Sequence, residues 1–316
     1  MSSSTDLLAC SPGLTRLVGQ IRRIAATART TVLIQGESGS GKELVARAIH
    51  ELSPRRAQRF VALNCAALTE GLLEAELFGY EGGAFTGGDP RGREGLLFAA
   101  EGGTLVFDEI GELAPGLQAK LLRALQERVY RRVGARDERA FDVRVIASTH
   151  RDLGREVSAG RFREDLFYRL NVLSLAVPAL RERPEDILPL SRRFLSRACA
   201  EFEREIQGLR PAAVTALERH NWPGNVRELE NTLQRAALMC SGPWIEASDL
   251  TLGTAQVFPG QHDALPLGDR SLRCVEQNLI RRVLEENAGN RSRAASVLGI
   301  NRTTLYAKLK SYGIAG

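Results

Sequence analysis

Short apolar runs alternate with longer amphipathic stretches over the first half of the chain. Between Thr31 and about Val177, the runs TVLIQ, FVALNC, GTLVFDE and VRVIAST each precede a helix-like segment or a loop. Short runs rich in β-branched residues are typical of buried strands, and strands that alternate with helices form a parallel sheet covered by helices. The pattern predicts an α/β domain over residues 1–177.

The apolar pattern changes after Pro178. PEDILPLSRRFLSRACAEF and NVRELENTLQRAALMC carry apolar residues at helical spacing, and no strand pattern recurs before about Leu250. These segments predict a small all-helical subdomain over residues 178–250. Residues 251–270 contain glycines and prolines without periodicity, which is typical of a linker.

Helical spacing returns over residues 271–316 and predicts a compact helical module. Gly299 supplies a turn before Ile300, which is expected to plug the core. Three apolar stripes form the expected core: Leu279, Ile280, Val283 and Leu284; Ala294, Ala295 and Leu298; Leu305 and Leu309.

Charge distinguishes this last module from the rest of the chain. The 316 residues carry a formal net charge of +5, and residues 271–316 hold eight Lys or Arg and three Glu, so 8 − 3 = +5 lies there. A local basic excess is the usual footprint of a nucleic-acid contact, although a solvated charged face has the same composition.

Several classes of protein are excluded by composition. No run of about eighteen apolar residues occurs, and the N-terminus lacks a basic region followed by an apolar stretch, so we expect a cytoplasmic protein without a membrane span or signal peptide. The five cysteines lie far apart and the four histidines show no H-E-x-x-H spacing. We therefore expect reduced thiols and no structural metal.

TVLIQGESGSGKELVARAIH places a strand, a glycine-rich turn and a helix in the order that a phosphate-binding loop requires. Gly36, Gly39 and Gly41 allow backbone N–H groups to converge on phosphate oxygens, and Lys42 can reach the β and γ phosphates. The match to G-x-x-x-x-G-K-S/T fails at Glu43, which replaces the hydroxyl that normally ligates magnesium. Taken alone, the segment fits a glycine-rich strand-to-helix turn equally well.

A second motif favours the nucleotide site. GGTLVFDEI ends in Asp108 and Glu109, so two carboxylates emerge at the carboxyl end of a strand, where ligands bind in open α/β sheets. Asp108 is the candidate Mg²⁺ ligand, and Glu109 is the candidate for orienting and polarising the attacking water. Beside the glycine loop, this pair favours an ATP site over an acidic strand end without a role.

Five segments, in the order GESGSGKE, ELFGYEGGAFTGG, GGTLVFDEIGEL, FREDLFYRLNV and WPGNVREL, resemble the AAA+ ATPase domain of the bacterial sigma-54-dependent activators, or enhancer-binding proteins. The resemblance runs from about Ser11 to Leu250. It implies a P-loop ATPase fold with a helical lid, and ATP hydrolysis that remodels sigma-54 RNA polymerase into an open promoter complex. Glu43 is usual in that family. The implied nucleotide-binding residues of the loop are Gly36, Glu37, Ser38, Gly39, Ser40, Gly41, Lys42 and Glu43.

The glycine-rich stretch after Phe78 is similar to the family's G-A-F-T-G-A signature. The resemblance implies a loop tip that touches the sigma factor and that rises and retracts with nucleotide state, for which glycine hinges are suited. The alternative is a surface loop whose aromatic ring folds back onto the body. Gly88 replaces the family's alanine and is expected to loosen the loop. The implied contact residues are Gly83, Ala84, Phe85, Thr86 and Gly87.

The resemblance also implies residues that couple the nucleotide to the rest of the domain. Asn64 would relay the state of the γ-phosphate from Glu109, which its amide could hydrogen-bond, toward the loop. The strand end at Thr149 and His150 resembles the first sensor, and both residues stay candidates because the family often has Asn in place of His150. Arg227 would be the second sensor in the lid, whereas the nearby Trp222 is expected in the lid core.

Arg163 and Arg169 lie six residues apart around an acidic pair. An arginine on a helix is most often a solvated charge, but phosphoryl transfer needs a cation that the nucleotide's own subunit lacks. The resemblance implies that both arginines act on a neighbouring subunit's ATP, as in the family's hexameric rings.

Residues 271–316 resemble the Fis-type helix-turn-helix of the same family. The second helix of such a pair enters the major groove of double-stranded DNA, here an upstream activating sequence. A helical bundle that serves only dimerisation is the alternative. The candidates for base or nearby phosphate contact are Arg302, Thr304, Tyr306 and Lys308, and those for phosphate contact are Arg291 and Arg293.

Together these observations predict an ATP-driven transcription activator. The rival hypotheses are a DNA-binding regulator or repressor whose ATPase module does not engage the sigma factor, and an ATP-driven protein unfoldase, against which the basic helix-turn-helix argues. Because the resemblance begins so near the start of the sequence, either a separate regulatory protein acts on the ring, or the chain is a piece of a longer protein.

Overall fold

The structure is a computed structural model that describes residues 10–83, 89–252 and 290–312, together with Gln277, Ile280, Val283 and Leu284. The chain divides into two compact units, residues 1–252 and 253–316. Among the described residues, no helix is both long enough and apolar enough to cross a membrane.

A parallel sheet of five strands in the order β2-β5-β8-β1-β9 forms the centre of the first unit. Four of the strands are the predicted runs, which confirms the parallel α/β fold. The fifth, β9, was missed because its sequence LSLA contains no β-branched residue, unlike the four predicted runs. The strands are β1 (Val32–Gln35), β2 (Phe60–Asn64), β5 (Thr104–Asp108), β8 (Arg144–Thr149) and β9 (Leu173–Ala176).

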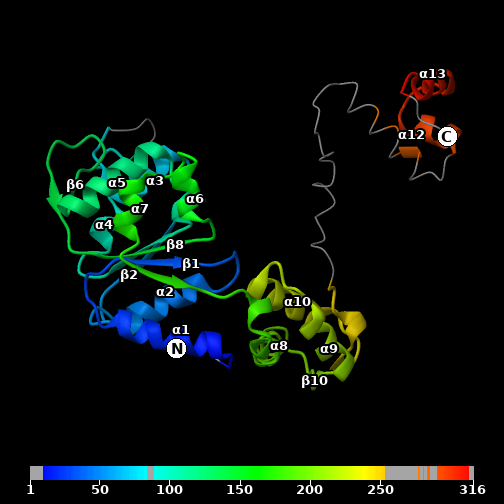
Figure 1. Cartoon of the computed structure of the whole chain (residues 1–316), viewed down its shortest axis with the longest axis horizontal. Helices are drawn as coiled ribbons and strands as arrows, with labels where there is room; N and C mark the ends of the chain where they lie inside the picture. Colours follow the sequence, from blue (N-terminus) through cyan, green and yellow to red (C-terminus); the bar gives the residue numbers. More distant parts are fainter. Residues whose placement is uncertain are drawn as a thin grey trace. The chain divides into compact units, whose positions relative to one another are not determined.

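Helices cover both faces of the sheet (Figure 1). Side chains alternate across each strand, so Val32 and Ile34 join one apolar core with α1 and α2, whereas Leu33 joins another on the opposite face. The helices of the first face are α1 (Pro12–Ala25) and α2 (Lys42–Glu51). Those of the second are α3 (Glu70–Phe78), α4 (Leu96–Ala99), α5 (Pro115–Glu127), α6 (Leu153–Ser158) and α7 (Glu164–Leu170).

Two short antiparallel pairs lie outside the main sheet. The first joins β3 (Gly79–Tyr80) to β4 (Arg93–Glu94), and the second joins β6 (Val129–Tyr130) to β7 (Arg139–Ala140). A 3₁₀ turn, η1 (Ile110–Glu112), follows β5. The first pair is the stem of the glycine-rich loop.

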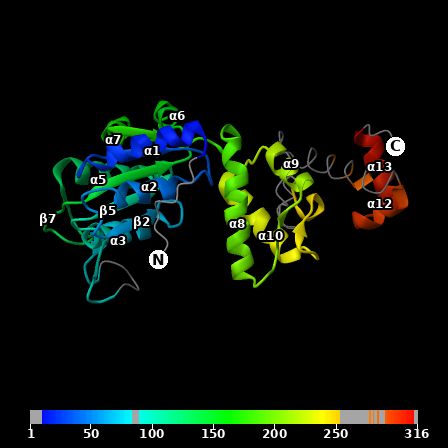
Figure 2. The same ribbon diagram turned by 90° about the horizontal axis from the view of Figure 1, so that it is seen from below.

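The lid contains α8 (Ile187–Glu201), α9 (Pro211–Arg219) and α10 (Asn225–Met239), which pack together in Figure 2. Trp222 is fully buried in its core and donates its indole N–H to the Leu217 carbonyl oxygen at 2.9 Å, which confirms its expected place. The expectation of an all-helical lid needs one correction, a parallel pair of β10 (Gly208–Leu209) and β11 (Trp244–Ile245). Strands of two residues are too short to show alternation in sequence. The remaining turns are η2 (Leu180–Glu182), η3 (Pro184–Asp186) and η4 (Ala247–Asp249).

The second unit contains α12 (Arg291–Val297) and α13 (Arg302–Tyr312). Gly299, with a φ of +65°, turns the chain between them, and Ile300 packs against the core as expected. The core matches the predicted stripes except for Leu279, which lies outside the described residues. Its buried members are Ile280, Val283, Leu284, Ala294, Ala295, Leu305 and Leu309.

Candidate functional site

The phosphate-binding loop connects β1 to α2. Gly39 and Gly41 adopt φ angles of +73° and +105°, a region that favours glycine. Lys42 begins α2 with only 6% of its surface exposed, and its Nζ donates to the carbonyl oxygens of Gly36 at 3.0 Å and Glu37 at 3.3 Å. The loop therefore surrounds the lysine ammonium at the N-terminus of a helix, where anions bind favourably.

The predicted carboxylate pair lies beside this lysine. Asp108 ends β5 and accepts a hydrogen bond on Oδ1 from the Ser148 hydroxyl at 2.7 Å. Glu109, at a φ of +54°, places Oε1 at 3.4 Å from Lys42 Nζ. Its Oε2 is contacted by His150, through the ring Nδ1 at 2.6 Å and the backbone N–H at 3.1 Å. The end of β5 is thus joined to the loop and to the end of β8.

This environment keeps Glu109 ionised. Burial alone raises the pKa of its carboxyl group, but the hydrogen bonds from His150 and the positive charge of Lys42 outweigh burial and leave that pKa below its ordinary value. A carboxylate in this state accepts hydrogen bonds only, as a residue that orients water must do.

The structure separates the two sensor candidates. Thr149 is fully buried, and its hydroxyl oxygen accepts from the Arg151 N–H at 3.0 Å. His150 faces Glu109. Of the two candidates, only His150 reaches the carboxylate in the described structure.

Asn64 lies next to Asp108 in the register of β2 and β5 but does not make the expected contact. Its amide oxygen accepts from the Ala66 N–H at 2.8 Å, and the described residues show no hydrogen bond from Asn64 to Glu109. Asparagine at the end of a strand readily accepts from the backbone two residues further on, and this local bond holds the Asn64 side chain against its own backbone.

Three lid residues that the sequence analysis did not predict contact the phosphate-binding loop. Arg181 donates to Glu37 through both terminal nitrogens, at 2.5 and 2.8 Å. Asn225, fully buried at a φ of +52°, donates Nδ2 to Glu37 at 3.1 Å and to the Ser38 carbonyl oxygen at 3.0 Å. Hydrogen bonds from Arg181 and Asn225 lower the pKa of Glu37 to about 2. Arg183 donates to the Ser40 carbonyl oxygen at 2.8 Å.

Arg227 lies where the second sensor was expected, two residues into α10. Its Nη1 is 3.5 Å from the Ser38 hydroxyl, and the Val226 N–H donates to the Gly39 carbonyl oxygen at 3.0 Å. A Cβ on Gly39 would lie 2.4 Å from the Gly224 carbonyl oxygen, so only glycine permits the lid to approach this closely. The sequence motif WPGNVREL indicated this close approach of the lid to the loop, since a Pro-Gly turn at the start of a helix suits close contact between backbones.

The two candidate arginine fingers lie away from the loop. Arg163 precedes α7 and pairs with Asp165 at 2.7 Å. Arg169 donates to the Leu125 carbonyl oxygen at 2.8 Å. Among the described contacts, neither arginine touches the phosphate-binding loop or Glu109 of its own chain.

Four of the predicted contact residues for the sigma factor, Ala84, Phe85, Thr86 and Gly87, lie outside the described residues. Gly83 is described and has a φ of +84°. In the stem below it, a Cβ on Gly82 would lie 1.9 Å from the Pro90 carbonyl oxygen, and one on Gly95 would lie 2.3 Å from the Gly79 nitrogen. Glycine is therefore required for close approach of the two sides of the stem.

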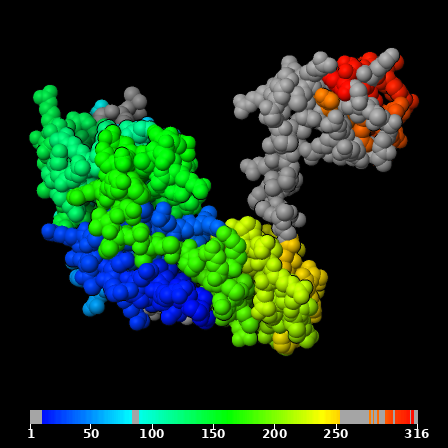
Figure 3. Space-filling model, in the orientation of Figure 1, coloured from blue at the N-terminus to red at the C-terminus, as the bar shows by residue number. Residues whose placement is uncertain are grey.

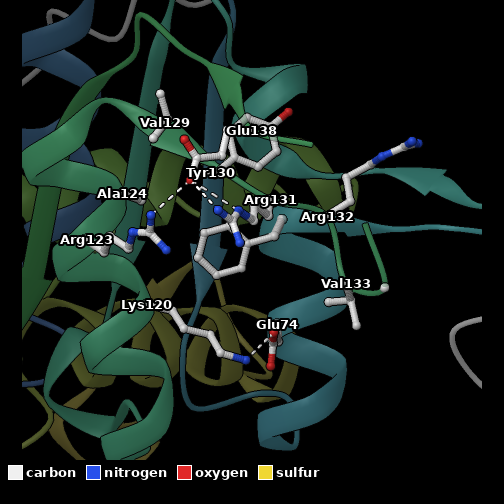
Figure 4. Close-up of a pocket in the computed structure, with 12 residues that line it drawn as sticks. Glu74, Lys120, Arg123, Ala124, Val129, Tyr130, Arg131, Arg132, Val133 and Glu138 are labelled. Atoms are coloured by element: carbon white, nitrogen blue, oxygen red, sulfur yellow. Dashed lines mark hydrogen bonds and ion pairs between the residues drawn. The ribbon is translucent and has the colours of Figure 1, made fainter. Parts of the chain in front are cut away.

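The hairpin β6–β7 holds this stem. Arg132 pairs with Glu81 at 2.9 Å, and Arg139 pairs with Glu94 at 2.8 Å. A cavity of about 350 Å³ lies beside the hairpin, between α3 and α5, with Tyr130 in its wall (Figure 4). Its lining residues include none of the phosphate-binding loop. The cavity is thus separate from the nucleotide site.

The second unit gathers the candidate DNA contacts on α12 and α13. Arg302, Thr304 and Tyr306 are exposed on α13, and Lys308 is half-buried. On α12, Arg293 is exposed, and the guanidinium of Arg291 lies 5.2 Å from the centre of the Tyr306 ring. The geometry brings Arg291 and Tyr306 together.

The strand order, the glycine loop after β1, the carboxylates after β5, the polar end of β8 and the lid define a P-loop ATPase of the AAA+ class. Residues 7–176 match the sigma-54 interaction domain, residues 181–264 match the AAA+ ATPase lid domain, and residues 271–312 match the bacterial regulatory protein, Fis family. The chain belongs to the sigma-54-dependent transcriptional activators.

Similar proteins agree with this assignment. The chain is 48% identical over 312 residues to the transcriptional regulatory protein ZraR of Escherichia coli K12, covering 98% of this chain and 69% of ZraR. It is 48% identical over 314 residues to the regulatory protein AtoC of the same organism, covering 98% of this chain and 68% of AtoC. NtrX of Brucella abortus in complex with ATP is 35% identical, with a TM-score of 0.72 over 98% of this chain and 69% of NtrX. The predicted family, fold class, ATPase activity and ATP binding are confirmed.

Proposed function

We propose that this chain assembles into a homo-oligomeric ring, a hexamer, on upstream activating DNA and uses Mg²⁺-dependent ATP hydrolysis to convert sigma-54 RNA polymerase into an open promoter complex. The observation that carries the proposal is the meeting of Lys42 and Glu109, 3.4 Å apart, between the phosphate-binding loop and the end of β5. Such a pair places a phosphate-binding cation beside a group that can orient water.

In this proposal, each part of the loop has a role. Backbone N–H groups of the loop and the Lys42 ammonium bind the β and γ phosphates, with Glu37, Ser38 and Ser40 shaping the loop and Glu43 following Lys42 in the first turn of α2. Arg227, beside Ser38, reaches the phosphates from the lid. Asn64 and Thr149 take part in sensing from the adjacent strand ends, while His150 holds Glu109.

Asp108 suits Mg²⁺. One of its oxygens accepts from Ser148, and the hydrogen bonds described for the side chain leave Oδ2 without a protein donor. Carboxylate oxygen is a ligand that Mg²⁺ prefers, and bound Mg²⁺ would neutralise phosphate charge. Glu109, held ionised by Lys42 and His150, orients the attacking water and accepts its proton.

The positions of Arg163 and Arg169 support the proposal of a ring. Arg163 and Arg169 lie away from their own loop, so we propose that they reach the ATP of a neighbouring subunit, where a cation stabilises the developing charge of phosphoryl transfer. The same loop would then be completed only in the assembled ring.

At the other end of the reaction, Phe85 and Thr86, flanked by Gly83, Ala84 and Gly87, contact the sigma factor. The tight glycine stem and its ion pairs to β6–β7 support a loop whose base is held while its tip moves. DNA is bound by α13 through Arg302, Thr304, Tyr306 and Lys308, with Arg291 and Arg293 on phosphates. We place the protein in the bacterial cytoplasm, where its DNA lies.

Transcription from a sigma-54 promoter, measured with and without hydrolysable ATP, tests the function. We expect transcripts only with hydrolysable ATP and only when sigma-54 is present. If the protein binds the upstream DNA and hydrolyses ATP but yields no transcripts, the ATPase module does not engage the sigma factor, and the regulator or repressor hypothesis replaces this one.

A further inference from the structure

A buried carboxylate fastens the start of α1 to the lid. Asp186, at the end of η3, is fully buried and accepts three hydrogen bonds from residues more than 170 positions earlier. Its Oδ1 accepts from the backbone N–H groups of Cys10 at 2.9 Å and Ser11 at 2.8 Å, and its Oδ2 accepts from the Ser11 hydroxyl at 2.8 Å. In Figure 3, the blue N-terminal segment meets the green start of the lid accordingly.

The same Ser11 starts the helix. Its hydroxyl oxygen also accepts from the Leu14 N–H at 3.3 Å, which makes Ser11 the N-cap of α1. One side chain thus both begins α1 and attaches it to Asp186, so the two cannot move independently.

A buried guanidinium at the opposite end of the same turn reaches the phosphate-binding loop. Arg183 is 4% exposed and donates Nη2 to the Ser40 carbonyl oxygen at 2.8 Å. Burial lowers the pKa of its guanidinium, and the negative charges of Asp186 and then Glu182 oppose this. Its Nε is buried without a hydrogen-bond partner in the described structure. Among the described contacts, the Arg183 guanidinium therefore makes one hydrogen bond, to the Ser40 carbonyl oxygen.

The turn between these two charges is short. The Asp186 N–H donates to the Arg183 carbonyl oxygen at 3.0 Å, closing a 3₁₀ turn that begins with Pro184. A proline fixes its own φ angle and stiffens such a turn. Burying a guanidinium whose Nε has no hydrogen-bond partner in the described structure is unfavourable for stability.

We propose that Arg183 and Asp186 are positioning residues for ATP binding. Arg183 holds the Ser40 carbonyl oxygen, and this fixes the loop so that its N–H groups converge on the phosphates. Asp186 is bonded to the start of α1, and through the 3₁₀ turn it sets the position of Arg183. Through this connection, the placement of residues 10 and 11 determines the affinity of the loop for ATP, and a displacement of that segment lowers it.

The proposal rests on the ATPase activity of the chain and not on promoter opening. The test therefore uses the full chain without sigma factor or DNA and measures three quantities: the KM of ATP hydrolysis, its kcat, and the dissociation constant of a fluorescent ATP analogue, whose binding requires no hydrolysis. A chain that bound the analogue but never hydrolysed ATP would contradict the proposed function while leaving this inference testable.

Arg183→Met removes the bond to Ser40 with little change in volume. We expect KM and the dissociation constant of the analogue to rise about tenfold, the effect of one lost charge-assisted hydrogen bond, with kcat changed less because Lys42 and Glu109 are intact. Arg183→Lys retains a charge opposite Asp186 and should restore part of the affinity. A purely structural role predicts a lower thermal midpoint with unchanged KM in both variants, and that result would overturn the proposal.

A matched pair of substitutions at the start of α1 tests the longer connection. Ser11→Ala removes the hydroxyl bonded to Asp186, whereas Thr15→Val removes a hydroxyl that bonds the Ser11 carbonyl oxygen at 3.0 Å and does not touch Asp186. We expect KM to rise several-fold in Ser11→Ala only. Both variants keep the buried charges, so they decide the question even if Arg183→Met does not fold. Equal KM values in the two variants would refute the connection.

Discussion

The ion pair between Glu37 and Arg181 leads to a prediction about stability and pH. The hydrogen bonds from Arg181 and Asn225 lower the pKa of Glu37 from the ordinary 4.5 to about 2. Taken at face value, this difference between folded and unfolded chains corresponds to about 3 kcal/mol of stability at neutral pH. The two side chains are 42% and 43% exposed, however, so solvent screening reduces the expected coupling to about 1 kcal/mol.

The sign of the pH dependence follows from the direction of the shift. Because the pKa of Glu37 is lower in the folded protein, its stabilisation is fully present above pH 4.5 and is lost as pH falls toward 2. By the linkage relation, about half of the effect should be gone at pH 3. High salt should weaken it as well, since the pair is exposed to solvent.

A double-mutant cycle measures this coupling. Glu37→Gln, Arg181→Met and the double variant are unfolded in urea at pH 7 and pH 3, with tryptophan fluorescence as the probe. The chain has two tryptophans, and both Trp222 and Trp244 lie in the lid, so the signal reports the domain that the pair attaches. We expect a coupling free energy of about 1 kcal/mol at pH 7 and about half of that at pH 3.

Two results would refute this reasoning. A coupling of zero at pH 7 would mean that water replaces the pair without loss, as it does for many surface ion pairs. A coupling that is equal at pH 7 and pH 3 would mean that the lowered pKa of Glu37 has another origin than Arg181. Arg197→Met, which breaks an exposed pair with Glu230 within the lid, is the control for the general effect of removing an arginine.

Four further predictions concern function. Glu109→Gln should bind ATP but lose hydrolysis by about two or more orders of magnitude, which near-normal turnover would contradict. Arg169→Ala mixed with Lys42→Ala should regain some ATPase activity, whereas a mixture that stays inactive would place the arginine in its own subunit's reaction. Arg302→Ala should weaken the specific DNA site by about 1–3 kcal/mol in a gel-shift titration, and unchanged affinity would move the contact elsewhere. Phe85→Ala should abolish the binding of sigma-54 in the presence of a transition-state-like nucleotide and leave the thermal midpoint unchanged. A lower midpoint with sigma-54 binding retained would mean that the Phe85 side chain packs in the core.

The loop and the strand ends could be predicted because their function is written in contiguous residues. Lys42 follows its glycines directly, and Asp108 and Glu109 follow their own strand, so spacing alone places them. Arg181 and Asn225 were missed because they contact Glu37 across more than 140 positions, and spacing along the sequence does not show which residues meet at such a separation. Such pairs depend on the fold, which brings the lid onto the loop.

The predictions for Asn64 and β9 failed for local reasons. In one case a side chain bonds to its own backbone, and in the other the strand pattern is weak. The resemblance implied a bond from Asn64 to Glu109, but the amide oxygen of Asn64 accepts from the Ala66 N–H, and this local bond holds the side chain against its own backbone. In β9, the sequence LSLA contains no β-branched residue, and Ser174 and Ala176 are exposed on an edge strand, so the segment lacks the pattern of the other four strands. A strand at the edge needs fewer buried residues than one in the middle.

The pairing of β1 with β9 has a mechanical consequence. The loop leaves the sheet after Gln35, the lid leaves it after Ala176, and these residues are register partners. The Val177 N–H donates to the Gln35 carbonyl oxygen at 2.7 Å, and a Cβ on Gly36 would lie 2.9 Å from the Val177 carbonyl oxygen. The point at which the lid leaves the sheet therefore adjoins the nucleotide loop and can serve as a hinge. A small rotation at this hinge displaces the far end of the lid much more than the end beside the loop.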